Sequence, residues 1–253
     1  MKAIARNIFI ITLIFCSIFS AAQDNEIIVK ANNLYNEGLY DSSLTLYKSV
    51  LEKNMHSAEL YYNIGNAYYK NNNIPEAILY YEKALKLSPN DEDIKYNLSI
   101  SNSMIVDKIE KVPQMFYKEW WNYFYELYNT NTWAILSIIS WILFLSSLGF
   151  FILTRKRRKK KLVFYLTVLL FLAATGSFGF ASQKYYYSKE NKEAIIFTPT
   201  ITVKSSPTKN SVDLFVVHEG TKVKIIDKLD KWNKIRIQDG SIGWLPVESM
   251  KMI

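Results

Sequence analysis

Two long apolar segments separated by a run of cations constrain this chain more than any other feature. Residues 133–153 and 162–182 contain no charged side chain, and each has about the ~20 residues that a helix needs to cross a membrane. The residues between them, 154–161, include seven consecutive cations: Arg155, Lys156, Arg157, Arg158, Lys159, Lys160 and Lys161. A short basic loop is retained on the cytoplasmic side of a membrane. The pattern therefore predicts a transmembrane helical hairpin with both flanking regions outside the cytoplasm.

The N-terminal segment predicts the same topology. Lys2 and Arg6 precede an apolar run over 8–19, and small residues follow at 20–22. This is the pattern of a cleaved secretory signal peptide, 1–22. The alternative is a retained helical anchor, whose apolar run is short for a span and which leaves the topology unchanged. We expect a protein of the bacterial inner membrane with its soluble parts on the periplasmic side.

Composition argues against several functional classes. The net charge is +8, but the cations are concentrated in 155–161 and the stretch 23–132 is net acidic, so nucleic acid is not an expected partner. The single cysteine, Cys16, lies in the signal segment and follows a bulky residue where a lipobox has a small one, so neither a disulfide nor lipidation is expected. His56 and His218 lie in separate regions and complete no metal or catalytic constellation. We expect no enzymatic activity, metal or cofactor.

A regular pattern of small and aromatic residues fills 58–91. The eight positions of the pattern are occupied by Tyr61, Ile64, Gly65, Tyr68, Ala77, Tyr81, Ala84 and Pro89. At these positions the segment resembles the 34-residue tetratricopeptide repeat family, in which small residues let two helices cross closely and a proline ends the second helix. A weaker copy precedes it from about Asp24, and a helix from Asp93 to about Glu110 is expected to cap the array. The resemblance implies an all-α repeat domain over 23–112.

The same resemblance implies a concave groove that binds peptides and is lined by the first helix of each pair. Four amides fall on groove-facing positions: Asn32, Asn63, Asn66 and Asn97. Amides both donate and accept hydrogen bonds, which suits recognition of a peptide backbone. Ile28 and Asp93 occupy two positions that carry cations in the family's carboxylate clamp, so a free C-terminal carboxylate is not the expected ligand. The alternative is that these asparagines are simply solvated.

Aromatic residues crowd the segment 113–132 just before the first apolar run. They are Trp120, Trp121, Tyr123, Phe124, Tyr125 and Tyr128, and Tyr185 to Tyr187 follow the second run. Amphipathic rings prefer the headgroup level of a membrane, so we predict a short helix lying in the interface. Packing of these rings against the repeat domain is the alternative.

Small residues in the second apolar run predict how the two helices meet. Ala173, Ser177 and Ala181 recur every four residues, which forms a face that another helix can approach closely. We expect this face to contact the first helix. The absence of charged residues from both runs argues against a proton relay or an ion path.

After a linker over 183–193, short alternating runs over 194–253 predict a small all-β unit. Its runs near 201–203, 214–217, 222–226, 232–237 and 242–245 are separated by turn residues. An Asp-Gly turn followed by Gly243 and Trp244 resembles the bacterial SH3-like family, which implies a small barrel. Trp232 and Trp244 are candidates for an aromatic binding surface, with a place in the core as the alternative. His218 is expected only to cover a turn.

The whole arrangement is that of a multi-domain membrane protein, and it resembles the BatE-type aerotolerance proteins. That resemblance implies a periplasm-facing scaffold in a complex for tolerance of oxygen or envelope stress. It also implies partners with von Willebrand A-type domains. The alternative function is a receptor in which the SH3-like unit binds cell-wall peptidoglycan.

Overall fold

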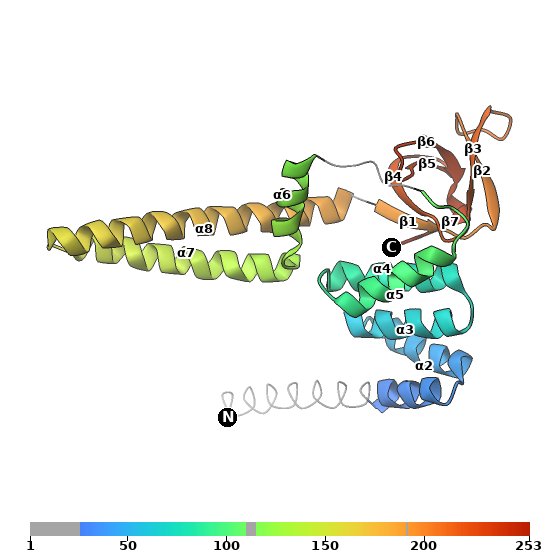
Figure 1. Cartoon of the computed structure of the whole chain (residues 1–253), viewed down its shortest axis with the longest axis horizontal. Helices are drawn as coiled ribbons and strands as arrows, with labels where there is room; N and C mark the ends of the chain where they lie inside the picture. The colour runs from blue at the N-terminus through green and yellow to red at the C-terminus, as the bar shows by residue number, and fades with distance from the viewer. Residues whose placement is uncertain (1–25, 110–114, 191) are drawn as a thin grey trace, which may run out of the picture.

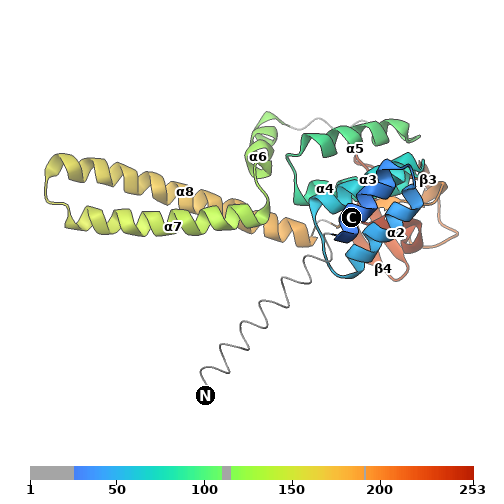
Figure 2. The same ribbon diagram turned by 90° about the horizontal axis from the view of Figure 1, so that it is seen from below.

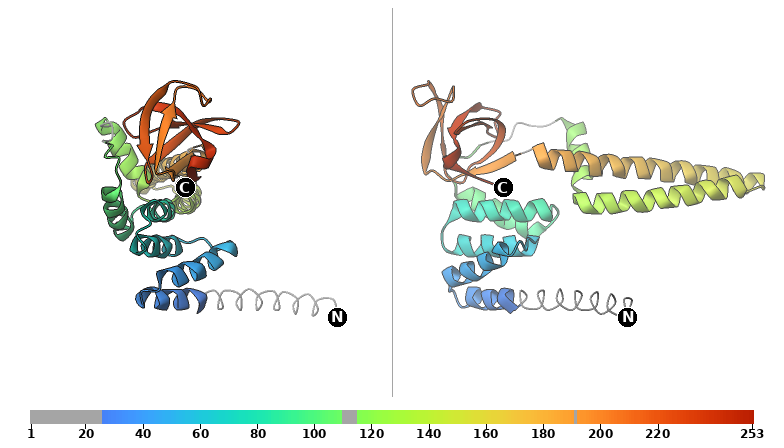
Figure 3. Two further views of the ribbon diagram at one scale, coloured as in Figure 1. Left: turned by 90° about the vertical axis from the view of Figure 1, so that its right-hand side faces the viewer. Right: turned by 180° about the vertical axis from the view of Figure 1, so that it is seen from behind.

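The computed structural model describes residues 26–109, 115–190 and 192–253, so the predicted signal peptide and Cys16 lie outside the described part of the chain. Figure 1 shows a stack of short helices, a long helical hairpin and a β-sheet domain. The stack and the sheet domain lie at one end of the hairpin, and the turn of the hairpin lies at the other (Figures 1 and 3). The predicted order of a helical array, two apolar helices and an all-β unit is confirmed.

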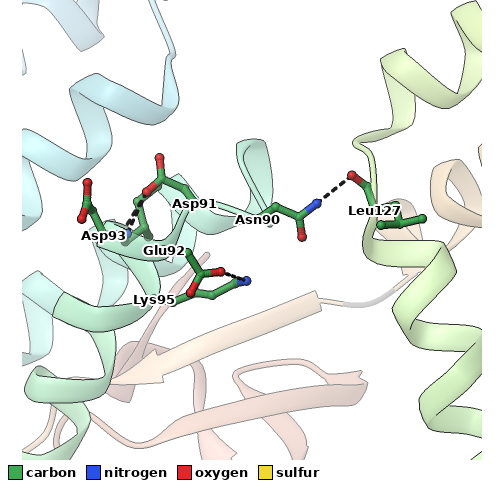
Figure 4. Close-up of polar contacts among 7 residues, drawn as sticks. Asn90, Asp91, Glu92, Asp93, Lys95 and Leu127 are labelled. Atoms are coloured by element: carbon green, nitrogen blue, oxygen red, sulfur yellow. Dashed lines mark hydrogen bonds and ion pairs between the residues drawn. The ribbon is translucent and has the colours of Figure 1, made fainter.

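Antiparallel helix pairs build the array. Residues 26–36 are helical, and they are followed by α2 (Tyr40–Glu52), α3 (Ala58–Lys70), α4 (Ile74–Leu87) and α5 (Glu92–Met104). Polar side chains cap the helix starts. The Ser57 side chain accepts a hydrogen bond from the Leu60 N–H at 3.1 Å, and Asp91 accepts from the Asp93 and Ile94 N–H groups (Figure 4). These caps satisfy amide groups that lack partners inside the helix.

The core of the array uses the small and aromatic positions of the repeat pattern. Ile64, Gly65, Tyr68, Ala77, Tyr81 and Ala84 are buried, Tyr61 is half-buried, and Pro89 follows the end of α4. Gly65 lies where α3 crosses α4, and a Cβ atom there would be 2.7 Å from two ring carbons of Tyr81. The side chain of Tyr81 is only 1% exposed, so it has little room to move away. The glycine therefore sets the distance between the two helices.

The hairpin consists of α7 (Thr130–Leu153) and α8 (Arg157–Glu190), and α6 (Phe116–Glu126) precedes it. Both hairpin helices are long and apolar enough to cross a membrane. Only 11% of the most apolar window of α7 and 17% of that of α8 is buried, so their apolar surfaces are mostly uncovered. Ser147 and Thr167 join the helices through a buried hydrogen bond of 2.8 Å.

Two boundaries of the hairpin differ from the sequence prediction. Helix α8 begins at Arg157, so most of the predicted basic loop 154–161 forms the first turns of this helix. At its other end α8 continues to Glu190, through most of the predicted linker 183–193. Residues 183–190 contain neither glycine nor proline, and nothing in that stretch stops a helix.

The contact face of α8 is rotated from the predicted one. Ser177 is buried against the hairpin partner as expected, but Ala173 is exposed and Ala174 is buried in its place. Thr167 and Ala174 are seven residues apart, which places both on one side of an α-helix. The seven-residue spacing therefore describes this face better than the four-residue spacing.

Polar side chains from two distant segments hold the C-terminal end of α6. Lys184 Nζ donates to the carbonyl oxygens of Tyr125 at 3.0 Å and Tyr128 at 2.6 Å. Asn90 Nδ2 donates to the carbonyl oxygen of Leu127 at 2.7 Å (Figure 4). Carbonyl groups at a helix end lack partners within the helix. These bonds therefore cap α6 and tie it to both α8 and the array.

Helix α6 lies across the axis of the hairpin, as Figures 1 and 2 both show. Its large side chains are largely exposed; Trp120, for example, is 72% exposed. Trp121 contacts Phe180 of α8, with ring centroids 5.0 Å apart. Most of the aromatic surface of α6 is therefore not covered by the array.

The C-terminal residues form one antiparallel sheet, referred to below as the β-domain (192–253). Its strands are β1 (Lys192–Ile196), β2 (Thr200–Lys204), β3 (Asp213–His218), β4 (Lys222–Leu229), β5 (Trp232–Arg236), β6 (Ile242–Pro246) and β7 (Met250–Met252), with a short 3₁₀ helix η1 (Val247–Ser249) before β7. The strand order is β3-β2-β6-β5-β4-β1-β7. All five predicted strands are present, and β1 and β7 are added together at one edge of the sheet, beside β4.

The array and the β-domain share a hydrophobic core. Ile195 of β1 is fully buried within the core cluster of the array. On the turn between β3 and β4, Gly220 has φ +85°, and a Cβ atom there would be 2.5 Å from Ile105 Cγ2. Lys222 bonds Glu82 of α4 at 2.9 Å and Glu193 of β1 at 3.0 Å. The β-domain therefore closes the C-terminal side of the array.

Asp107 forms the polar centre of this junction. The carboxylate accepts hydrogen bonds from the His218 N–H at 2.7 Å and from the Thr221 hydroxyl at 2.6 Å, and it bonds the His218 ring nitrogen Nδ1 at 2.7 Å. The predicted capping helix ends at Met104, before this residue. Burial raises the pKa of Asp107, but the bonds from Thr221 and His218 outweigh burial and lower it below 3.8. The junction therefore favours the charged carboxylate.

The first prediction tests the helix crossing. Gly65→Ala places a methyl group against the Tyr81 ring and should lower the free energy of unfolding by about 1–3 kcal/mol. Urea unfolding of the solubilised full chain, followed by far-UV circular dichroism, measures this change. Gly176→Ala is the control, because a Cβ atom at Gly176 meets nothing within 4 Å. Equal stability of Gly65→Ala and the wild type would contradict the close crossing.

The second prediction tests the junction through its pH dependence. A carboxyl group whose pKa is lowered by folding stabilises the fold above its unfolded pKa, and this stabilisation is lost as the pH falls through the folded value. Asp107→Asn should therefore lower the free energy of unfolding by about 1–3 kcal/mol at pH 7. The difference from the wild type should shrink below about pH 4, as the wild-type carboxyl group becomes protonated.

Chemical denaturation at pH 7 and at pH 3 measures both values. The control is Asp93→Asn, which removes the same charge at an exposed position. A constant difference between wild type and Asp107→Asn at the two pH values would show that the charge of Asp107 does not stabilise the junction.

Candidate peptide-binding groove

The first helices of the array place the four predicted amides along one surface. Asn32 lies on the helix 26–36, Asn63 and Asn66 lie on α3, and Asn97 lies on α5. All four side chains are half-buried. They line two adjoining hollows of about 310 and 290 Å³, which share Tyr35 and Asn66. This surface is called the groove below.

Two of the amides hold the helices of a pair together. Tyr47 donates its hydroxyl hydrogen to Asn32 Oδ1 at 2.5 Å. One repeat further on, Tyr81 donates to Asn66 Oδ1 at 2.7 Å. Asn97 Nδ2 also donates to Asn66 Oδ1, at 2.9 Å. The oxygen atoms of Asn32 and Asn66 are therefore already engaged within the array.

Asn63 differs from these amides. It lies on α3 in the wall of the larger hollow, and its side chain has no hydrogen-bond partner within the described part of the chain. A half-buried amide without a partner leaves a donor and an acceptor available to a ligand. Of the four predicted amides, Asn63 is therefore the best placed to bond a peptide backbone.

The groove is polar but nearly uncharged. Burial raises the pKa of Tyr35, Tyr47 and Tyr81, so their hydroxyl groups stay neutral at physiological pH. Glu59 lines the larger hollow and Lys70 the smaller one, and both residues are exposed. Neutral donors and acceptors with one charge of each sign suit an uncharged peptide backbone.

The tyrosines of the groove were not predicted as groove residues, although the sequence contains a signal for them. Tyr35 and Tyr69 lie one repeat period of 34 residues apart, as do Tyr47 and Tyr81. Identical residues at one repeat spacing occupy equivalent positions in the stack. The same signal did not exist for Asp107, Glu82 or Lys222, which meet only through tertiary packing.

Trp232 and Trp244 lie on the outer face of the β-domain. Both are half-buried, and neither belongs to the buried core, which contains Val203, Ile235 and Leu245. Trp232 pairs with Pro246, and Trp244 pairs with Lys234 on the neighbouring strand. This placement differs from the core position that was the alternative.

His218 does more than cover the turn between β3 and β4, because its ring also bonds Asp107.

The described residues include no group of three or more His, Cys, Asp or Glu side chains arranged to hold a metal ion. The groove has neither a nucleophile beside a base nor a phosphate-binding loop among these residues. Its chemistry is that of hydrogen bonding and apolar contact.

Comparison with known proteins identifies the repeat. Residues 58–91 match the tetratricopeptide repeat family, which is the segment formed by α3 and α4. No curated protein matches the chain. The repeat is a non-catalytic protein-interaction motif, and it implies protein partners. The chain thus carries a protein-interaction scaffold, together with two helices that could span a membrane.

Proposed function

We propose that this protein is a membrane-anchored scaffold whose groove binds an extended, uncharged peptide segment of a partner protein. The observation that carries the proposal is the row of half-buried amides and neutral tyrosines, in which Asn63 has no hydrogen-bond partner among the residues that the structure describes. Main-chain groups of an extended peptide present alternating donors and acceptors, and amide side chains can match both. Ile28 and Asp93 stand at two positions that carry cations in the carboxylate clamp, which argues against a carboxylate ligand.

The hairpin is proposed to anchor this scaffold in the inner membrane of a bacterium, with the array and the β-domain on the periplasmic side. Both lie at the end of the hairpin opposite the basic residues 155–161, which supports this orientation (Figure 1). The exposed rings of α6, which lies across the hairpin, suit the headgroup layer on the same side.

The larger role proposed is that of a BatE-type component in a complex for aerotolerance or envelope stress. The β-domain would be its SH3-like unit, and the partners would carry von Willebrand A-type domains. The order of array, hairpin and β-domain supports this proposal. One observation favours a second candidate, a peptidoglycan receptor: Trp232 and Trp244 lie on the outer face of the sheet rather than in the core.

The third prediction tests the groove by separating binding from stability. Asn63→Ala should weaken capture of the partner about tenfold without lowering the melting temperature, because the Asn63 side chain makes no hydrogen bond among the described residues. Asn66→Ala should lower the free energy of unfolding by about 1–3 kcal/mol, because it leaves the buried Tyr81 hydroxyl without its acceptor.

Partner capture by the purified full chain, immobilised in nanodiscs, and thermal unfolding of each variant measure the two effects. Asn33→Ala is the control, because Asn33 is exposed and lines neither hollow. Unchanged capture by Asn63→Ala would show that the groove amides are simply solvated and do not bind the partner.

The fourth prediction tests the topology of the anchor. A reporter that is active only outside the cytoplasm should work when fused after Asp91 or after Ile253 and should fail after Lys161. Neutralising residues 155–161 should produce mixed orientations, because it removes the positive charge that keeps the turn of the hairpin on the cytoplasmic side. Reporter activity after Lys161 in the unmodified chain would refute the proposed orientation.

A further inference from the structure

A cleft separate from the groove lies where the array meets the β-domain. Its volume is about 880 Å³. The array contributes apolar side chains, among them Leu85, Leu98 and Ile105, and the sheet contributes a polar wall that includes Lys224 and Arg236. The lining also includes Glu82, Asp107 and Lys108 from the array and Val223 and Ile237 from the sheet, so the cleft offers both apolar and charged groups.

Most acidic side chains of the cleft are already engaged. Glu82 and Glu193 both bond Lys222, at 2.9 and 3.0 Å. Burial lowers the pKa of Lys222, but these two carboxylates outweigh burial and raise it, so the ammonium group stays charged. Asp107 already accepts hydrogen bonds from His218 and Thr221, at the turn between β3 and β4. Glu126 is the remaining acid of the described lining.

Two cations of the cleft have no ion-pair or hydrogen-bond partner in the described part of the chain. Lys224 of β4 and Arg236 of β5 are directly opposed in the register of the sheet. Among the described residues neither side chain makes an ion pair or a hydrogen bond. Like charges directly opposite one another destabilise a pair of strands. On the other side of β4, Lys224 lies directly opposite Glu193 of β1, whereas Arg236 lies between Lys224 and Ile242, so Arg236 is the cation that no directly opposed carboxylate balances in the register of the sheet.

The charged wall continues onto the outer face of the sheet. Two residues along β5 from Arg236, Lys234 lies opposite Trp244 of β6. Its ammonium group is 5.9 Å from the centre of the indole ring. Alternate residues of a strand point to the same face, so Lys234 and Arg236 belong to one surface. A ligand that leaves the cleft along β5 would meet Lys234 and the ring of Trp244, with Asp227 of β4 directly opposite Lys234.

We propose that this cleft is a second binding site, which takes an acidic, extended peptide segment with apolar side chains between its carboxylates. The planar fork of Arg236 matches a carboxylate through two parallel hydrogen bonds. The leucine and isoleucine wall accepts the apolar side chains, and Asn102 and Gln238 of the lining can bond the peptide backbone. The site goes beyond the proposed groove and would stand even if the groove bound nothing.

The proposal predicts opposite effects on binding and stability. Replacing Arg236 by glutamine removes a ligand contact and also removes the repulsion from Lys224. Residues kept for binding often reduce the stability of the free protein. Arg236→Gln should therefore bind acidic peptide more weakly while its melting temperature stays the same or rises. If Arg236 served only the fold, Arg236→Gln would lower the melting temperature and leave peptide binding unchanged.

The test uses the full chain in nanodiscs of zwitterionic lipid and a fluorescein-labelled octapeptide of alternating glutamate and leucine. Fluorescence anisotropy should show binding that weakens with salt, and a matched peptide of alternating glutamine and leucine should bind at least about tenfold more weakly. Lys224→Gln with Arg236→Gln should weaken binding of the acidic peptide about tenfold. Lys228→Gln, on the exposed end of β4, is the charge-matched control and should bind as the wild type does.

Four results would overturn the proposal. They are no binding of the glutamate peptide, equal binding of both peptides, unchanged binding by the double variant, and a melting temperature lowered by Arg236→Gln. Millimolar inorganic phosphate should displace the glutamate peptide much less effectively than unlabelled peptide does. Equal displacement by phosphate would show a simple anion site and would also overturn the proposal. Asn63→Ala should leave this binding unchanged, which separates the cleft from the groove.

Discussion

The packing of β1 against α4 is the contact on which the rest of this structure depends. Two helix pairs and a single capping helix are close to the smallest array that can bury its own core. In this chain the outer side of α4 is covered by Ile195, and Gly220 lets the turn between β3 and β4 approach Ile105 closely. Asp107 and Lys222 satisfy the polar groups at the edge of that contact. The β-domain thus completes the array.

This arrangement determines where the binding surfaces lie. The array is held against the β-domain, and α6 is tied to the array by Asn90 and to α8 by Lys184. The groove therefore has a defined position relative to the hairpin. The cleft between array and β-domain is a direct consequence of the same contact, because its two walls come from the two parts.

Features encoded locally were predictable from the sequence, whereas features made by distant segments were not. The spacing from Tyr61 to Pro89 indicated the repeat, because the residues that pack together are at most one repeat apart. The alternation of apolar and polar residues indicated five strands, because the residues that form one strand are adjacent in the sequence. The contacts of Asp107 with His218 and Thr221 join residues more than 110 positions apart, and no periodicity in the sequence marks them.

The errors of the prediction have similar causes. The four-residue spacing of small residues on α8 predicted a contact at Ala173, whereas packing against α7 buries Ala174 instead. The four predicted amides lie on the helix 26–36, on α3 and on α5. Only the structure distinguishes Asn66, which bonds Tyr81, from Asn63, which has no partner among the described residues.

Native-state hydrogen exchange of the full chain in nanodiscs tests the central claim, that the array and the β-domain form one cooperative unit. Amides of α3 and α4 and amides of β4 and β5 should exchange through the same global opening, with equal free energies. Ile195→Ala, which opens a cavity in the shared core, should lower the opening free energy of both sets of amides equally, by about 2–5 kcal/mol. Loss of protection in β4 and β5 with unchanged protection in α3 and α4 would show that the array folds by itself and would contradict the account.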